Sequence, residues 1–130
     1  MKQPFKKNER LSRFQLIRKL FREGSTLHVP AFRMTWLIVE TFDNPLPQVM
    51  FSVPKHHFHT AVDRNLIRRR MRECYRLNKQ LLNPSLPPKP SSLLICITYM
   101  AKEILPFSDI QAKIILLLQR LTEVNEKLTR

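Results

Sequence analysis

The sequence predicts an α+β fold, an α-β-β-α-β-α two-layer sandwich, from two patterns of apolar residues. Helical periodicity is present in residues 12–23, from about 61 to 82, and from 108 towards the C-terminus. Residues 32–38, 49–53 and 93–99 are rich in side chains that favour strands. Because 130 residues is a single-domain length, we expect one domain over residues 1–130. Within it, residues 1–8 should be flexible and residues 83–92 should form a proline-rich linker.

The first predicted helix is amphipathic and has recognisable ends. Ser12 and Gln15 have the spacing of a capping box, and Gly24 is a common helix stop. Three apolar side chains form one stripe at helical spacing: Phe14, Ile17 and Phe21. Basic residues cover much of the remaining surface, so one side of this helix can be buried while the other stays in water.

The predicted strands are assigned by their turns and their polarity. Turn-forming residues 43–45 lie between the strands at 32–38 and 49–53, so we expect these two strands to form an antiparallel pair. Residues 93–99 form a continuous apolar run, which is typical of a central strand covered on both faces. Pro84 should end the second helix before this strand.

The charge of the chain indicates a polyanionic partner. There are 23 Lys and Arg residues against 10 Asp and Glu, a net charge of +13. Residues 1–82 carry 17 of the basic and 6 of the acidic side chains. Charge that serves solubility alone should be spread evenly, whereas charge gathered in one part of a chain is typical of nucleic-acid binding.

Cysteine usage and hydropathy exclude several classes of protein. Cys74 and Cys96 both lie in apolar stretches, so we expect two reduced core thiols in a cytoplasmic protein. The three histidines at 56, 57 and 59 lack the ligand spacing of a zinc site, and we expect no metal bound by the protein. No apolar run reaches the roughly 18 residues of a membrane span, so no membrane partner is expected.

The second predicted helix carries a basic face that is separate from its apolar face. Six polar side chains fall within an arc of about 140° on a helical projection: Arg64, Asn65, Arg68, Arg69, Arg72 and Arg76. A helix face that only contacts solvent usually carries charges of both signs, but here the arginines one turn apart, from Arg64 to Arg76, all have the same charge. Each such like-charged pair lowers the stability of the helix by a few tenths of a kcal/mol, unless a bound anion reduces the repulsion. Because the planar guanidinium group of arginine binds phosphate oxygens through two hydrogen bonds, we interpret this face as a phosphate-binding surface.

Residues 61–73 resemble a family signature. They are similar to the pattern A-V-x-R-N-x-I-K/R-R-x-x-R-E of the ribonuclease P protein component. The strand Phe51–Lys55 before the helix also resembles that family, as do Arg10-Leu11 and the segment Leu20–Gly24. The resemblance extends from about residue 7 to residue 121.

This resemblance implies the RNA-binding subunit of ribonuclease P, the endonuclease that removes the 5′ leader from precursor tRNA. It implies that the chemistry belongs to a large catalytic RNA and its Mg²⁺, with no catalytic residue in the protein. The expected partners are the ribonuclease P RNA and the single-stranded leader of precursor tRNA. The family's left-handed strand–helix–strand crossover, an exception to the usual rule, would join the strands at 49–53 and 93–99.

The resemblance also assigns two sets of site residues. Lys55 joins the arginine face as a contact to the catalytic RNA. The leader would lie in a cleft between the first helix and the sheet, lined by Phe14, Ile17, Phe21, Arg10 and Arg33. Two positions depart from the family pattern, because Leu66 replaces an arginine and Ile17 replaces an aromatic residue. Stacking on leader bases should therefore be weaker than is usual for the family.

Two other classes remain as alternatives. A ribosomal or other passive RNA-binding protein would carry the same charge, and only the helix signature argues against it. A protein-only nuclease would need clustered carboxylates for magnesium, or a histidine pair with a lysine. The ten acidic residues are scattered singly along the chain, so this class is disfavoured.

Overall fold

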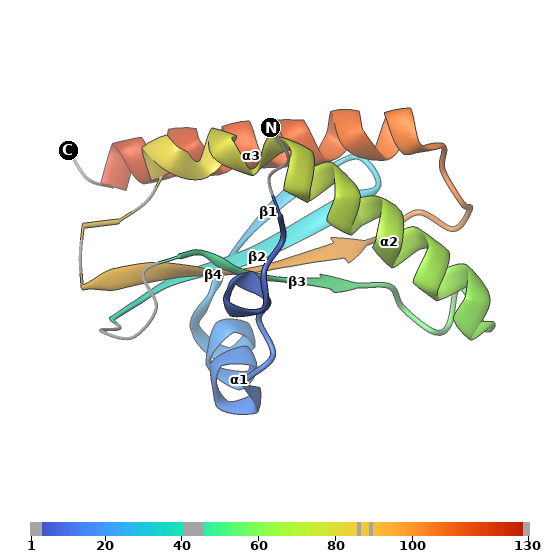
Figure 1. Ribbon diagram of the computed structural model, residues 1–130, viewed down its shortest axis with the longest axis horizontal. Helices are drawn as coiled ribbons and strands as arrows, with labels where there is room; N and C mark the ends of the chain where they lie inside the picture. Colours follow the sequence, from blue (N-terminus) through green and yellow to red (C-terminus); the bar gives the residue numbers. More distant parts are fainter. Residues whose placement is uncertain (1–3, 41–45, 86, 89, 129–130) are drawn as a thin grey trace.

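The computed structural model describes residues 4–40, 46–85, 87–88 and 90–128, and it confirms the α+β class (Figure 1). Three α-helices and two short 3₁₀ helices surround one four-stranded mixed sheet. In chain order, the elements are η1 Lys7–Glu9, α1 Phe14–Glu23, β1 Ser25–Val29, β2 Phe32–Glu40, β3 Gln48–Ser52, α2 Ala61–Asn78, η2 Lys79–Ser85, β4 Ser91–Tyr99 and α3 Phe107–Leu128.

The helices cover the two faces of the sheet unequally. Helices α2 and α3 form a layer over one face, where the larger apolar core lies, and α1 lies on the opposite face (Figure 1). A smaller core packs beneath α1 around Leu20, Leu94 and Cys96. The short α1 therefore adds a partial third layer to the predicted sandwich, and it leaves part of this second face of the sheet uncovered by a helix.

The strand order is β1-β2-β4-β3. Strand β2 is antiparallel to both β1 and β4, and β3 is parallel to β4. The predicted antiparallel pairing of residues 32–38 with 49–53 is therefore wrong, because β4 lies between these strands. The reason is the continuous apolar run of β4, whose residues 92–99 are all buried and need neighbours on both edges. The turn predicted at residues 43–45 lies outside the described residues.

Strands β3 and β4 are joined through α2, as the resemblance implied, whereas the handedness of this crossover stays a prediction. The helix ends at Asn78, and η2 continues through Pro84 to Ser85. The expected linker at residues 83–92 therefore overlaps a 3₁₀ helix at one end and β4 at the other. Proline is tolerated in η2 because a short 3₁₀ segment needs fewer backbone N–H donors than a continuing α-helix.

The N-terminal segment is attached to the fold over the part that the structure describes. Phe5 packs edge-on against Phe51 and Tyr75, with ring centroids 6.0 and 5.7 Å away. Buried Glu9 accepts a hydrogen bond from Lys79 Nζ at 2.7 Å, which ties η1 to the end of α2. The expected flexibility of residues 1–8 stays a prediction, and the contacts of Phe5 and Glu9 would oppose it from residue 5 onward.

Helix α1 starts and ends by different means from those expected. The predicted capping box of Ser12 and Gln15 does not form, because the N-cap is Arg13 and no side chain caps the helix. The stop at Gly24 is confirmed, and its N–H donates to the carbonyl of Leu20 at 2.8 Å. Gly24 has an ordinary extended backbone, so space rather than conformation requires glycine here. A Cβ at this position would meet the Leu20 carbonyl and lie 2.9 Å from the Trp36 carbonyl.

We expect Gly24→Ala to lower the free energy of unfolding by about 1–3 kcal/mol, the usual cost of overpacking. Both opposing atoms belong to the backbone, so neither can rotate away, and α1 must shift relative to β2. Thermal or denaturant unfolding measures this effect. Ser25→Ala is the control, because Ser25 is exposed and adjacent. Equal stability of the two variants would contradict the close approach.

Candidate RNA-binding surface

Helix α2 presents its basic face because its other face is fully buried. The Thr60 side chain caps the helix by accepting a hydrogen bond from the N–H of Asp63 at 3.3 Å. The four residues predicted for the apolar arc are confirmed as core and are at most 1% exposed: Ile67, Met71, Cys74 and Tyr75. Burial raises the pKa of Cys74 to about 12, so this thiol stays protonated and unreactive.

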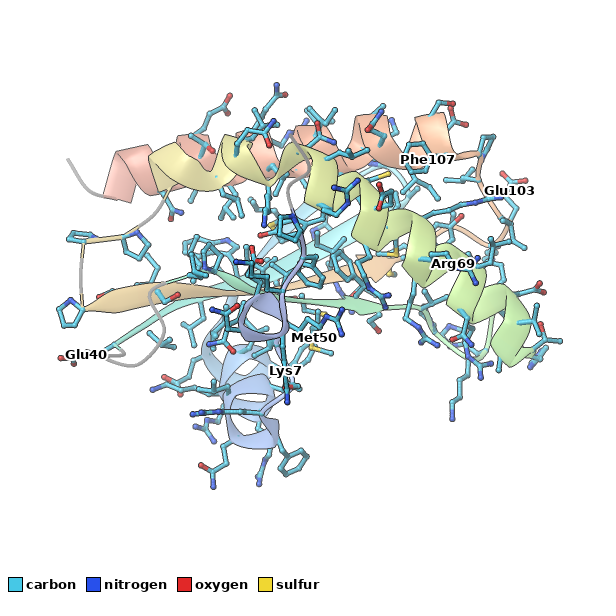
Figure 2. The ribbon with its side chains drawn as sticks, in the orientation of Figure 1. Lys7, Glu40, Met50, Arg69, Glu103 and Phe107 are labelled. Atoms are coloured by element: carbon cyan, nitrogen blue, oxygen red, sulfur yellow. The ribbon has the colours of Figure 1, made fainter. Side chains whose placement is uncertain are left out.

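The polar residues of this face fall into two groups by their partners. Arg69 and Arg72 are exposed, and within the described residues they have no hydrogen bond or ion pair (Arg69 is labelled in Figure 2). Arg68 Nη2 donates to Asn65 Oδ1 at 2.6 Å. Arg76 pairs with Glu73, and this hydrogen bond lowers the pKa of Glu73. The strongest unopposed positive charge on α2 therefore lies at Arg69 and Arg72.

Two arginines of α2 hold the protein's own backbone. Arg64 Nη1 donates to the carbonyls of Phe58 at 2.7 Å and His59 at 2.9 Å, which fixes the loop before the helix. Arg70 Nη1 donates to the carbonyl of Leu105 at 2.9 Å, which ties α2 to the segment between β4 and α3. Arg64 was predicted to contact RNA, but its guanidinium already has structural partners.

The loop that precedes α2 adds further donors beside the basic face. Lys55 is exposed there, as the resemblance requires. The rings of His56 and His57 lie 4.0 Å apart between centroids. Desolvation and the charges of His56 and Lys102 lower the pKa of His57. Within the described residues, no group of three or more His, Cys, Asp or Glu side chains could hold a metal ion.

The opposite face of the sheet carries a second polar surface beside α1. Side chains alternate along each strand, and the strand register places four polar residues in one row across the sheet: His28, Arg33, Thr98 and Ser52. The neighbouring row continues with Thr26, Thr35, Cys96 and Met50, of which Met50 is labelled beside α1 in Figure 2. Arg33 thus lies at the centre of a polar floor.

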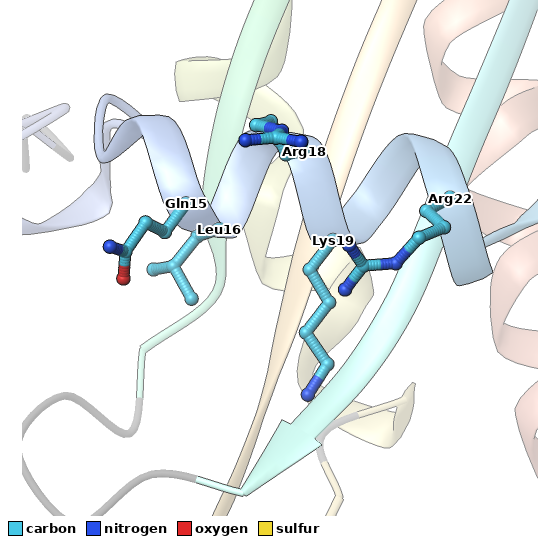
Figure 3. A pocket seen from close by; sticks show the side chains of 5 residues that line it. All are labelled: Gln15, Leu16, Arg18, Lys19 and Arg22. Atoms are coloured by element: carbon cyan, nitrogen blue, oxygen red, sulfur yellow. The ribbon is translucent and has the colours of Figure 1, made fainter.

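The α1 residues predicted to contact the leader lie along the edge of this floor. Phe14 and Phe21 are 69% and 52% exposed, so neither ring is needed for the core. Ile17 is half-buried and packs against the smaller core with Leu16. Leu16 points towards the end of β2 (Figure 3). Helical periodicity puts Ile17 and Phe21 on the other side of α1, towards the row that contains Arg33.

Arg10 lies where the N-terminal segment runs along the edge of β3. It forms an isolated parallel bridge with Val49, and its guanidinium lies 5.6 Å from the centroid of the Phe5 ring. Val49 belongs to the larger core, and Phe5 packs there against Phe51 and Tyr75, so the guanidinium of Arg10 lies on the α2 side of the sheet and not over the polar floor. Four of the five predicted leader residues, Phe14, Ile17, Phe21 and Arg33, therefore lie on the face of the sheet that carries α1, and Arg10 does not.

Sequence analysis missed part of this floor. His28 was missed because β1 was not predicted, since this edge strand lacks an apolar run. Thr98 was hidden within the apolar run of β4, and Ser52 within that of β3. A period-two reading of these strands would have found them, because 52 and 98 follow the alternation that puts apolar residues on the other face.

Comparison with known proteins identifies the family. The family model Ribonuclease P matches residues 5–122. The ribonuclease P protein component of Porphyromonas gingivalis is 31% identical over 105 residues, which cover 81% of this chain and 77% of the relative. The component of Chlorobium phaeobacteroides is 36% identical over 80 residues, or 59% of this chain and 55% of the relative.

Solved structures share the fold at lower identity. The RNase P protein of Staphylococcus aureus superposes with a TM-score of 0.62 at 18% identity, covering 88% of this chain and 97% of that chain. The RNase P protein of Thermotoga maritima gives 0.61 at 24% identity, with coverage of 86% and 96%. A family match over most of the chain, curated relatives and a shared fold agree. The chain therefore belongs to the bacterial ribonuclease P protein component family, the protein part of an endoribonuclease.

Proposed function

We propose that this subunit holds two RNAs at once, the ribonuclease P RNA on α2 and the 5′ leader of precursor tRNA on the opposite face of the sheet. The observation that carries this proposal is the placement of the two polar surfaces. The exposed Arg69 and Arg72 are on α2, whereas Phe21 borders the polar floor beside α1 and Arg33 lies within that floor. Because the sheet separates the two surfaces, neither RNA would have to displace the other.

The two surfaces suit two kinds of RNA. The exposed part of the α2 face consists mainly of guanidinium groups, which favour the phosphates of a structured RNA. The face beside α1 combines the exposed aromatic rings of Phe14 and Phe21 with Arg33, and unpaired bases stack on such rings. A single-stranded leader meets both requirements, since its bases are free to stack and its phosphates remain charged.

In this proposal the protein contributes binding and the RNA contributes the chemistry. Two of the acidic side chains that could attract a metal ion already pair with cations, as Glu9 does with Lys79 and Glu73 with Arg76. Mg²⁺ would be held by the catalytic RNA, where it would activate the attacking water. The protein's cations would reduce the repulsion between catalytic RNA and substrate, a role that Mg²⁺ otherwise fills.

Reconstitution with a bacterial catalytic RNA and a precursor tRNA tests this division of labour. We expect the protein to raise cleavage most at low Mg²⁺, because its positive charge then matters most, and to cut no RNA alone. Single-turnover cleavage across a Mg²⁺ series measures the effect. Leader cleavage by rigorously RNA-free protein would contradict the proposal, and so would a protein effect that is independent of Mg²⁺.

The chief alternative is a passive RNA-binding protein, and the same assay separates the two. A passive binder would bind the catalytic RNA through its charge but leave the cleavage rate unchanged at every Mg²⁺ concentration.

None of the helices in the described part of the chain combines the length and the hydropathy that a membrane span requires.

A further inference from the structure

Helix α1 has a second exposed side, and it is hollowed and basic. The hollow is lined by five residues of α1: Gln15, Leu16, Arg18, Lys19 and Arg22 (Figure 3). In Figure 3, Leu16 and Lys19 point to the same side of the helix, towards the end of β2. The cleft proposed for the leader lies on the other side of α1, so the function of that cleft does not account for this hollow.

The charges around the hollow are nearly all of one sign. Gln15, Lys19 and Arg22 recur at spacings of four and three residues, so their side chains share one strip of α1. The only ion pair among the lining residues in the described part of the chain joins Arg22 to Glu23 at 3.2 Å, and both partners are largely exposed. An exposed pair of this kind is weak and leaves Arg22 available to another anion.

Helix α3 provides an internal comparison for an ordinary solvated face. Its exposed and half-buried charges include both signs, with Asp109 one turn from Lys113 and Glu123 three residues from Arg120. The strip on α1 is less mixed, because it has three cations, Arg18, Lys19 and Arg22, and one acid, Glu23, which lies one turn from Lys19. Such a strip favours an anion with regularly spaced charges.

The basic strip adjoins the aromatic edge of the cleft. The guanidinium of Arg18 lies 5.6 Å from the centroid of the Phe14 ring. Going around α1 from the cleft, the exposed surface therefore passes from Phe21 and Phe14 to Arg18, and then to Arg22 and Lys19. A chain that leaves the cleft over the aromatic edge would meet the cations next.

We propose that the hollow beside Lys19 and Arg22 binds phosphates of the distal leader, the nucleotides farther from the cleavage site than those in the cleft. This inference rests on the proposed leader cleft and extends it. A single strand can bend around a helix about 10–12 Å in diameter, whereas a rigid duplex cannot. The lining offers three cations, the amide of Gln15 and one apolar side chain, Leu16, and it includes no aromatic ring for base stacking, so the backbone phosphates are its expected ligands.

The experiment measures the affinity of reconstituted holoenzyme for precursor tRNAs whose leaders lengthen one nucleotide at a time. The variant is Lys19→Ala/Arg22→Ala, with Lys19→Gln/Arg22→Gln as a second version that retains long side chains. Lys113→Ala is the matched control, because it removes a cation from α3 on the other face of the sheet. Thermal unfolding checks that each variant is folded, as expected for side chains outside the core.

We expect wild-type affinity to rise with leader length beyond the length that fills the cleft. In both double variants this rise should stop at a shorter leader, while affinity for the shortest leaders is unchanged. With long leaders, the slope of log affinity against log salt should fall by about 0.7 for each phosphate that the variant no longer binds. Lys113→Ala should follow the wild-type profile.

Three outcomes would overturn the inference, and they are distinguishable. If affinity depends on leader length in the double variants as it does in the wild type, the basic strip contacts only solvent. An equal loss at every length, including mature tRNA, would assign it to the tRNA body or the catalytic RNA. A wild-type protein that does not distinguish precursor from mature tRNA would overturn the leader cleft itself, and this inference with it.

Discussion

Replacing Arg69 and Arg72 together with alanine is expected to weaken binding of the catalytic RNA about 100-fold while the fold stays intact. Both side chains are exposed and lack partners within the described residues, so their removal breaks no hydrogen bond or ion pair there. A hydrogen bond to a charged group contributes about 1.5 kcal/mol or more. Two such bonds to phosphate give about 3 kcal/mol, which corresponds to two powers of ten in affinity.

The salt dependence of binding provides a second measure of the same change. Each phosphate that the variant no longer binds should reduce the slope of log affinity against log salt by about 0.7–0.9. Titrations at several salt concentrations with the catalytic RNA alone measure both quantities. Stability should hold or rise slightly, because Arg72 lies one turn from Arg68 and from Arg76 and these like charges repel.

Arg70→Ala is the matched control on the same helix. It removes the same side chain, but Arg70 is bonded to the carbonyl of Leu105. We expect this variant to unfold at a lower temperature and yet to bind the catalytic RNA with nearly wild-type affinity while folded. The opposite pattern, in which Arg69→Ala/Arg72→Ala unfolds early and binds RNA normally, would make the exposed arginine face structural.

The basic face of α2 could be predicted from sequence because it depends on local periodicity. A helix of known phase fixes which residues are buried, and Ile67 and Tyr75 are buried as predicted. The partners of the arginines could not be predicted in the same way. Arg70 bonds to a carbonyl 35 residues away, and the place of that carbonyl depends on how the chain returns from β4.

The pairing of the strands was predicted wrongly although the sequence contained the correction. Residues 93–99 were predicted to form a central strand, and in a sheet with two other strands the centre must separate them. The turn residues at 43–45 instead favoured a local pairing of the strands at 32–38 and 49–53. Burial of β4 on both faces decides the order, and this condition is non-local. The edge strand β1 then completes the sheet, and its only apolar signal is the alternation of Leu27 and Val29.

Phe21→Leu is expected to lower affinity for precursor tRNA about 5- to 150-fold, since stacking of a base on an aromatic ring contributes roughly 1–3 kcal/mol. The ring is 52% exposed and borders the polar floor, so leucine retains most of the buried contact and removes only the stacking surface. Affinity for mature tRNA and for the catalytic RNA should barely change, because neither has a leader. Equilibrium binding of precursor and mature tRNA to the holoenzyme gives the ratio of the two affinities, which is the quantity that tests this prediction.

Phe107→Leu is the control for this substitution. It makes the same chemical change at a half-buried ring that packs against the larger core, at the start of α3 on the other face of the sheet. It should lower the melting temperature more than Phe21→Leu does and leave the ratio of precursor to mature tRNA affinity at the wild-type value. If Phe21→Leu also left this ratio unchanged while lowering the melting temperature, Phe21 would be a packing residue. The exposed flank of α1 would then have no role in holding the leader.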